Sequence, residues 1–184
     1  MKFRELELPG AYVIEAEPIR DSRGFLARIF SQDEFAQIGF RDKIVQMNHT
    51  STLAAGIVRG MHYQMPPFAE CKVVKCIRGR VFDVVVDIRA GSETFLKWTA
   101  VEISEENMNM MYVPRGFAHG FQSLVDRCEL IYLHTAPYAK DAERGLRTDD
   151  PELSIKWPLP ITYQSDRDLG HPLIDPRHFK GVTL

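Results

Sequence analysis

Short segments rich in β-branched residues, each bounded by turn residues, fill the middle of the chain. The segment 81–88 (VFDVVVDI) lies between Arg78-Gly79 and Ala90-Gly91. Segments of similar character occupy 71–77, 95–103, 110–113, 120–124 and 129–134. Strands spaced roughly 8–12 residues apart predict a sandwich or barrel, whereas a βαβ fold would need helical stretches of about 10–15 residues that this region lacks. We therefore predict an all-β fold.

The length of the chain fits one domain. Its 184 residues are enough for a sizeable core, and two full domains would be cramped. We find no repeat, low-complexity tract or linker-like stretch. We therefore expect a single domain over residues 1–184.

One helix signal stands outside the strand series. Ser31 and Glu34 have the spacing of a capping box, and Gly39 provides a stop. The last third of the chain is rich in proline, so we expect it to wrap the barrel as loops with few short helices. Its charged cluster at 165–168 (SDRD) either folds back towards a binding site or forms a solvated turn, and the residues alone favour the turn.

Charge and composition exclude several classes of protein. Lys and Arg number 23 against 25 Asp and Glu, without the basic excess of proteins that bind nucleic acid through phosphates. No stretch approaches the ~20 apolar residues that span a bilayer, and the start of the chain (MKFRELELPG) lacks the apolar core of a secretory signal. The three cysteines are an odd number, which favours buried packing thiols over a disulfide framework. We expect a cytoplasmic protein that binds neither nucleic acid nor membrane.

Most of the candidate chemistry lies in segments 56–64 (GIVRGMHYQ) and 114–121 (PRGFAHGF), followed by Lys72 and Tyr132 respectively. Residues two apart on a strand share a face, so His62, Lys72 and Tyr132 converge if their faces line a barrel interior. Taken singly, each is more often a packing or surface residue. Together they are harder to dismiss, because a buried Lys or His needs a partner or a purpose.

The run from Pro114 to His119, with a glycine-bounded strand that carries a histidine, resembles the cupin superfamily. This resemblance implies a jelly-roll barrel with a few short peripheral helices. Metal-binding cupins carry an H-x-H pair, a following Glu and a later His, but here Gln64 replaces the second histidine and Glu70 is not in the usual place. Two plausible ligands, His62 and His119, are too few for a zinc or iron site. We therefore predict no catalytic metal.

A closer resemblance emerges when further motifs are taken in order. They are DSRGF (21–25), QMNH (46–49), VRGMHYQ (58–64), RGRVFDVVVDIR (78–89), GFAHGF (116–121), DDP (149–151), WP (157–158) and SDRD (165–168). Together they resemble the dTDP-4-dehydrorhamnose 3,5-epimerase family over nearly the whole chain. The combination is highly specific, although no single motif is.

That resemblance implies a cofactor-free isomerase that inverts C3 and C5 of a nucleotide-linked 4-keto-6-deoxyhexose. His62 would be the base, Asp168 its partner, Lys72 the group that faces the developing enolate, and Tyr132 the proton donor on the opposite face. Substrate-binding positions would be Arg23, Gln46, Asn48, Arg59, His119, Tyr138, Glu143 and Arg167. A homodimer is implied too, with amino-terminal strands that cross to the partner and carry Arg23 to its site.

The chain departs from the family pattern at Ile19, Leu26, Phe68 and Thr148, which we expect near the nucleotide end and the pocket rim. Two other functions therefore stay open. One is a single-site 3- or 5-epimerase, or a ketoisomerase, that acts on another nucleotide-linked sugar. The other is a sugar-nucleotide-binding cupin without catalytic activity.

Overall fold

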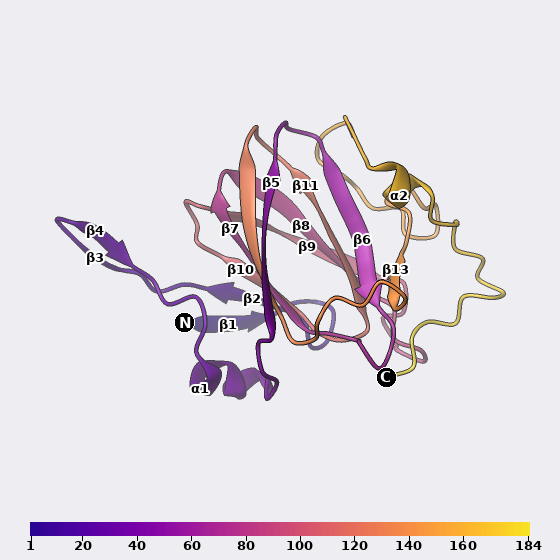
Figure 1. Ribbon diagram of the computed structural model, residues 1–184, viewed down its shortest axis with the longest axis horizontal. Helices are drawn as coiled ribbons and strands as arrows, with labels where there is room; N and C mark the ends of the chain where they lie inside the picture. Colours follow the sequence, from indigo (N-terminus) through magenta and orange to yellow (C-terminus); the bar gives the residue numbers. More distant parts are fainter.

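Two antiparallel sheets face each other in the computed structural model, which describes residues 1–184 (Figure 1). The six-stranded sheet has the spatial order β1 (Lys2–Glu5), β2 (Tyr12–Glu15), β10 (Met110–Val113), β7 (Lys72–Arg78), β12 (Cys128–His134), β5 (Gln46–Thr52). The five-stranded sheet has the order β13 (Glu143–Gly145), β6 (Val58–Gln64), β11 (Phe117–Ser123), β8 (Arg80–Asp87), β9 (Trp98–Ser104). From β5 to β8 the chain passes from one sheet to the other at every strand. The predicted all-β jelly roll is confirmed.

Most predicted strands lie within a residue of their expected bounds. The predicted strand 95–103 starts later, at Trp98, because 92–97 is a turn in which the Phe95 N–H donates to the Ser92 carbonyl. The predicted strand 120–124 starts earlier, at Phe117, because Phe117 to Ser123 pair with β8 without interruption.

Strand β8 shows why the middle of the sequence is so apolar. Val81 and Val85 point into the core between the sheets, together with Val74 of β7. Val84 and Val86 point outward into a second cluster. Both faces of β8 are covered, so the strand lacks the alternation of a half-exposed strand. Burial of each such side chain contributes about 1.5–3 kcal/mol.

The C-terminal segment covers the outer face of the five-stranded sheet. Leu153, Ile155 and Ile174 pack in the cluster that contains Val84 and Val86, and Figure 1 shows this segment running over that side of the barrel. Its regular structure after β13 is one helical turn, α2 (Asp166–Leu169). The expectation of a loop-rich wrap is thus confirmed.

The predicted helix is present as one turn, α1 (Gln32–Phe35), continued by a 3-10 turn, η1 (Ala36–Ile38), that ends at Gly39 with φ 79°. The predicted capping box is wrong, because the Ser31 side chain makes no cap hydrogen bond. Glu34 instead accepts from the Met1 amino group at 2.7 Å and from Arg28 at 2.6 Å. Packing of Phe35 against neighbouring aromatic rings holds the turn against the six-stranded sheet.

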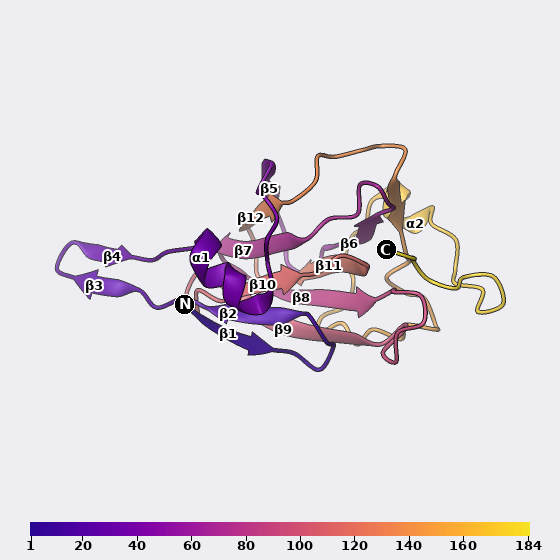
Figure 2. The ribbon, with the colours of Figure 1, turned by 90° about the horizontal axis from the view of Figure 1, so that it is seen from below.

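A hairpin of β3 (Ile19–Asp21) and β4 (Gly24–Leu26) extends away from both sheets, as the two views show (Figures 1 and 2). Its apolar side chains Ile19, Phe25 and Leu26 are 72%, 58% and 71% exposed. The three cysteines are buried free thiols, as predicted. No helix has the length and apolar character needed to cross a membrane.

Candidate active site

A cavity of about 780 Å³ opens between the two sheets. Strands β5, β7 and β12 of one sheet and β6, β11 and β13 of the other contribute to its wall, together with α2. It collects all four predicted catalytic residues, His62, Lys72, Tyr132 and Asp168. It also collects seven of the eight predicted binding residues: Gln46, Asn48, Arg59, His119, Tyr138, Glu143 and Arg167.

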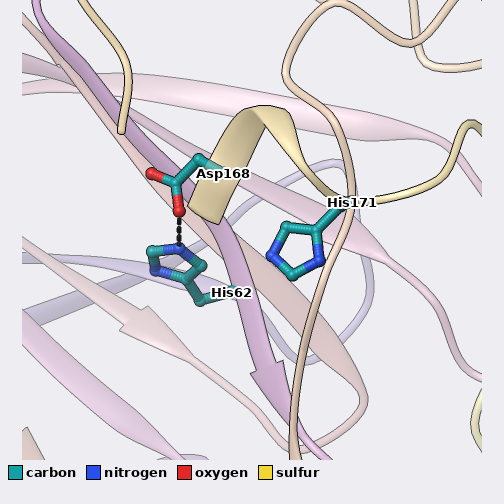
Figure 3. A group of neighbouring side chains, drawn as sticks. All are labelled: His62, Asp168 and His171. Carbon is teal, nitrogen blue, oxygen red and sulfur yellow. Dashed lines mark hydrogen bonds and ion pairs between the residues drawn. The ribbon is translucent and has the colours of Figure 1, made fainter. Parts of the chain in front are cut away.

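Asp168 reaches the cavity from α2 and pairs with His62 of β6 (Figure 3). The distance from His62 Nε2 to Asp168 Oδ1 is 2.7 Å, and the Asp168 side chain is 4% exposed. The expectation of a solvated turn at 165–168 is therefore wrong. Ser165 caps this helical turn by accepting from the Asp168 N–H at 3.1 Å, which orients the carboxylate inward.

A close approach of two backbones supports this pair. Gly60 has φ 130°, and a Cβ there would lie 2.6 Å from the Cα of Gly120 on β11. Only glycine fits at this point. Its N–H donates to Asp168 Oδ2 at 3.3 Å. The same pairing places His62 opposite His119 in the register of β6 and β11.

The hydrogen bond between His62 and Asp168, here called the dyad, determines which nitrogen of the His62 ring is free to accept a proton. Burial alone would raise the pKa of Asp168, but hydrogen bonds from His62, Gly60 and Ser165 lower it below its usual value. Asp168 is thus a carboxylate that accepts a hydrogen bond from Nε2–H, which leaves the lone pair of a neutral imidazole on Nδ1. No protein group hydrogen-bonds Nδ1. The arrangement suits a base whose free nitrogen is Nδ1.

Lys72 belongs to a second buried ionic group. Its Nζ lies 3.4 Å from Glu70 Oε1, and the Lys72 side chain is 11% exposed. The other oxygen of Glu70 lies 2.7 Å from His134 Nδ1, and His134 Nε2 lies 3.3 Å from the Asn48 amide. The sequence argument missed Glu70 and His134 as site residues. The alternation of side chains along a strand could have indicated both residues, because Glu70 is two residues from Lys72 and His134 is two residues from Tyr132.

Tyr132 lies between two histidine rings on the six-stranded side. Its ring is 6.0 Å from that of His119, edge to face, and 6.0 Å from that of His134, stacked. Burial and the nearby Asp83 raise the pKa of Tyr132, so the phenol stays protonated. His119 Nε2 lies 2.9 Å from Asp83 Oδ1, and burial raises the pKa of Asp83. Asp83 is a further residue that the sequence argument missed.

The outer end of the cavity is more polar and more exposed. Tyr138 hydrogen-bonds Glu143 at 2.9 Å, and its backbone N–H donates to the Gln46 side chain at 3.0 Å. Arg167 lies 3.1 Å from Glu143. Arg59 also lines the cavity but lies towards the other end of β5, where it donates to the Ser51 carbonyl at 3.1 Å. A guanidinium group in the cavity wall suits an anionic group with several oxygens.

Arg23 is the one predicted binding residue outside the cavity. It lies at the tip of the β3–β4 hairpin, its side chain is 88% exposed, and its partner there is Asp21. The four positions that depart from the family pattern do not line the cavity of the same chain. Ile19 and Leu26 belong to the hairpin, Phe68 is on the surface, and Thr148 is buried against Gln164.

A third ring lies beside the dyad (Figure 3). Ligand atoms of His62, Asp168 and His171 lie within 4.8 Å of one another. Burial lowers the pKa of His171. His171 was not predicted as a site residue, and the absence of a catalytic metal stays a prediction.

Comparison with known proteins extends this picture. The sequence model of the dTDP-4-dehydrorhamnose 3,5-epimerase family matches residues 5–175. A relative of that name from Shigella flexneri is 39% identical over 181 residues, which cover 97% of this chain and 99% of the relative. A dTDP-6-deoxy-D-glucose-3,5-epimerase from Legionella pneumophila, solved with dTDP-4-keto-L-rhamnose, superimposes with a TM-score of 0.91 at 34% identity and covers 100% of this chain and 99% of its own. A 3'-monoepimerase from Streptomyces bikiniensis, solved with dTDP-quinovose, gives 0.84 at 35% identity, with coverage of 91% and 85%.

Proposed function

The chain belongs to the dTDP-4-dehydrorhamnose 3,5-epimerase family, and from this premise we propose that it converts dTDP-4-dehydro-6-deoxy-D-glucose to dTDP-4-dehydro-L-rhamnose. The observation that carries the proposal is the position of two side chains in one cavity. His62 comes from β6 of one sheet and Tyr132 from β12 of the other, and both line the same space. A sugar ring between them would have a proton acceptor on one face and a proton donor on the other.

The substrate supplies its own activation. Its 4-keto group acidifies the C–H bonds at C3 and C5, so removal of either proton gives an enolate and no cofactor is required. The protein has to accept the proton, stabilise the negative charge on the ketone oxygen, and return a proton to the opposite face. Repetition at the second carbon completes the double inversion.

His62 takes the proton in this mechanism. Nδ1 removes it from the carbon, and the resulting imidazolium keeps its Nε2–H bond to Asp168. The carboxylate stabilises this cation, because a hydrogen bond between two charged groups is stronger than one to a neutral group. Asp168 is therefore a positioning residue that also lowers the energy of the protonated base.

Lys72 stabilises the negative charge on the enolate oxygen in this mechanism. It lies on β7, beside β12 and on the side of the cavity that holds Tyr132. Glu70 keeps the ammonium group in place at 3.4 Å. A fixed cation in a site with little water stabilises an enolate by several kcal/mol, on the order of the effect of a single oxyanion-hole donor.

Tyr132 returns the proton. Its raised pKa keeps the phenol protonated until the enolate forms. His119 and the buried Asp83 fix one side of the ring, and His134 fixes the other. Before the second inversion, the phenolate regains a proton from water and the imidazolium of His62 releases its proton to water.

Polar residues spread along the cavity wall would hold the nucleotide. Arg59 and Arg167 suit the diphosphate, because guanidinium groups bind such oxygens in pairs. Four other residues that line the cavity suit the nucleoside: Gln46, Asn48, Tyr138 and Glu143. Arg167 would exchange its contact with Glu143 for a phosphate oxygen.

We propose a homodimer in which the β3–β4 hairpin reaches the partner's cavity. The exposed Ile19, Phe25 and Leu26 give it an apolar surface to bury, and Arg23 at its tip would add a third guanidinium to the partner's diphosphate site. A mixture of Arg23→Ala and His62→Ala proteins tests this. Mixed dimers contain one site with both an intact His62 and an intact Arg23, so activity should return; no recovery, or a fully active monomer by light scattering, contradicts the proposal.

Proton exchange in heavy water decides among the possible reactions. Incubation with dTDP-4-keto-6-deoxyglucose, followed by NMR, should show deuterium at both C3 and C5, and His62→Ala should show none while keeping its fold. Exchange at one carbon would favour a single-site epimerase. The similarity to a 3'-monoepimerase makes this the main alternative. No exchange would indicate a binding protein. We also propose cytoplasmic residence, which the three buried free thiols support.

A further inference from the structure

His171 differs from the other five histidines of the chain. His49, His62, His119, His134 and His178 each lie within 3.0 Å of a carboxylate oxygen. His171 has no carboxylate partner, and neither of its ring nitrogens makes a hydrogen bond within the protein. It lies just after α2, with its ring against the His62–Asp168 pair (Figure 3).

We propose that His62, Asp168 and His171 form a binding site for a divalent transition-metal ion such as Zn²⁺, and that the bound ion inhibits the enzyme. Two imidazoles and one carboxylate are a ligand set that suits zinc, copper, nickel and cobalt, and not magnesium or calcium. The ion is an inhibitor in this proposal, not a cofactor.

The distances allow the site with small side-chain movements. The three ligand atoms now lie within 4.8 Å of one another. Zinc bonds of about 2.0–2.2 Å in a tetrahedron place ligand atoms roughly 3.4 Å apart. The proton between His62 Nε2 and Asp168 Oδ1, now 2.7 Å apart, would leave, and the pair would open to admit the ion. His171 would move inward, and water would complete the coordination.

The ring next to the dyad has room because of a glycine. A Cβ at Gly145 of β13 would lie 2.2 Å from His171 Nε2, so only glycine at this position lets the ring lie where it does. Arg167 opposes the ion, since its Nη2 lies 3.2 Å from His62 Nε2. Its side chain is 55% exposed and also contacts Glu143, so it can move away from the metal.

Inhibition follows from the tautomer of His62. A metal on Nε2 leaves the neutral imidazole with its proton on Nδ1. Nδ1 is the nitrogen to which the proposed function assigns proton abstraction, so the base loses its lone pair. The inhibitory part of the proposal rests on that function, whereas the metal binding does not. Turnover should therefore fall when the ion binds.

Calorimetric titration of the purified wild-type protein with ZnCl₂ tests the binding, and the visible absorption of bound Co²⁺ reports its coordination. We expect one ion per chain and no binding of Mg²⁺. Loss of a residue that only supports a metal ligand weakens metal binding by about 10- to 100-fold. Because His171 would be a direct ligand, His171→Ala should weaken Zn²⁺ binding by at least that factor. His178→Ala, which changes an exposed histidine elsewhere, is the matched control and should bind like wild type. If His171→Ala does not fold, His171→Gln replaces it.

Unchanged Zn²⁺ affinity in the His171 variant, or equal loss in the control, would overturn the site, as would the absence of stoichiometric binding. In the activity assay, Zn²⁺ should lower the turnover of wild type far more than that of His171→Ala. Turnover that persists with bound Zn²⁺ would refute the inhibition. A protein that binds Zn²⁺ through His171 but shows no epimerisation would refute the proposed function and leave the metal site standing.

Discussion

Replacement of Asp168 by asparagine isolates the contribution of one charge to catalysis. The His62–Asp168 hydrogen bond of 2.7 Å becomes a bond between two charged groups when His62 takes the proton. Hydrogen bonds to charged groups contribute about 1.5–3 kcal/mol. At about 1.4 kcal/mol for each factor of ten in rate, loss of that charge should lower turnover by about 10- to 150-fold.

The asparagine amide adds a second effect in the same direction. Its NH₂ group can donate to His62 Nε2, which moves the imidazole proton to Nδ1 and removes the lone pair from the reacting nitrogen. The Gly60 N–H keeps an oxygen acceptor in this variant if the amide adopts that orientation, so the fold should survive. We therefore expect the loss to lie towards the upper end of the range.

The assay is turnover of dTDP-4-keto-6-deoxyglucose, together with deuterium uptake at C3 and C5. Thermal melting and the affinity for dTDP check folding and the nucleotide end. Asp166→Asn is the matched control, because it makes the same chemical change on an exposed residue of the same helical turn. A loss in Asp168→Asn no larger than in Asp166→Asn would refute the role assigned to the carboxylate.

Three further predictions follow from the site and the core. Lys72→Ala should lower kcat much more than substrate affinity, because the charge that Lys72 meets exists mainly in the transition state; an equal loss in both would count against the enolate role. Tyr132→Phe should retain deuterium exchange on the His62 face but lose inverted product, and inversion at the wild-type rate would exclude the phenol as donor. Burial would raise the pKa of Asp87, but hydrogen bonds from Arg89, Ser92 and Thr94 lower it from 3.8 to about 2. The carboxylate thus stabilises the fold by about 2 kcal/mol above pH ~4 and loses that contribution as the pH falls towards ~2, so melting curves of wild type and Asp87→Asn should converge in that range; a constant gap would contradict the pKa.

The sheets were predictable because their signal is local. Alternation along single strands indicated that His62, Lys72 and Tyr132 point to one interior, and all three line the cavity. The apolar run of β8 was readable as a strand for the same reason, although only the structure shows that its two faces enter different cores.

Pairings between distant segments were not predictable from local patterns. Asp168 meets His62 across 106 positions, and without the family resemblance its segment was interpreted as a turn. The capping box failed because Glu34 found the Met1 amino group, a partner that no local pattern reveals. Glu70 and His134 were missed because a charged residue near a strand end usually faces solvent, whereas these two satisfy each other in the cavity wall.

Asp168, which orients the base, lies after every strand of the barrel in the sequence. All thirteen strands precede α2 in the sequence, so a ribosome releases the complete set of strands before the residue that orients the base. Without Asp168 in place, the imidazole of His62 would be free to adopt either tautomer. Packing of the C-terminal segment therefore both covers the outer apolar face of the five-stranded sheet and places the carboxylate on His62.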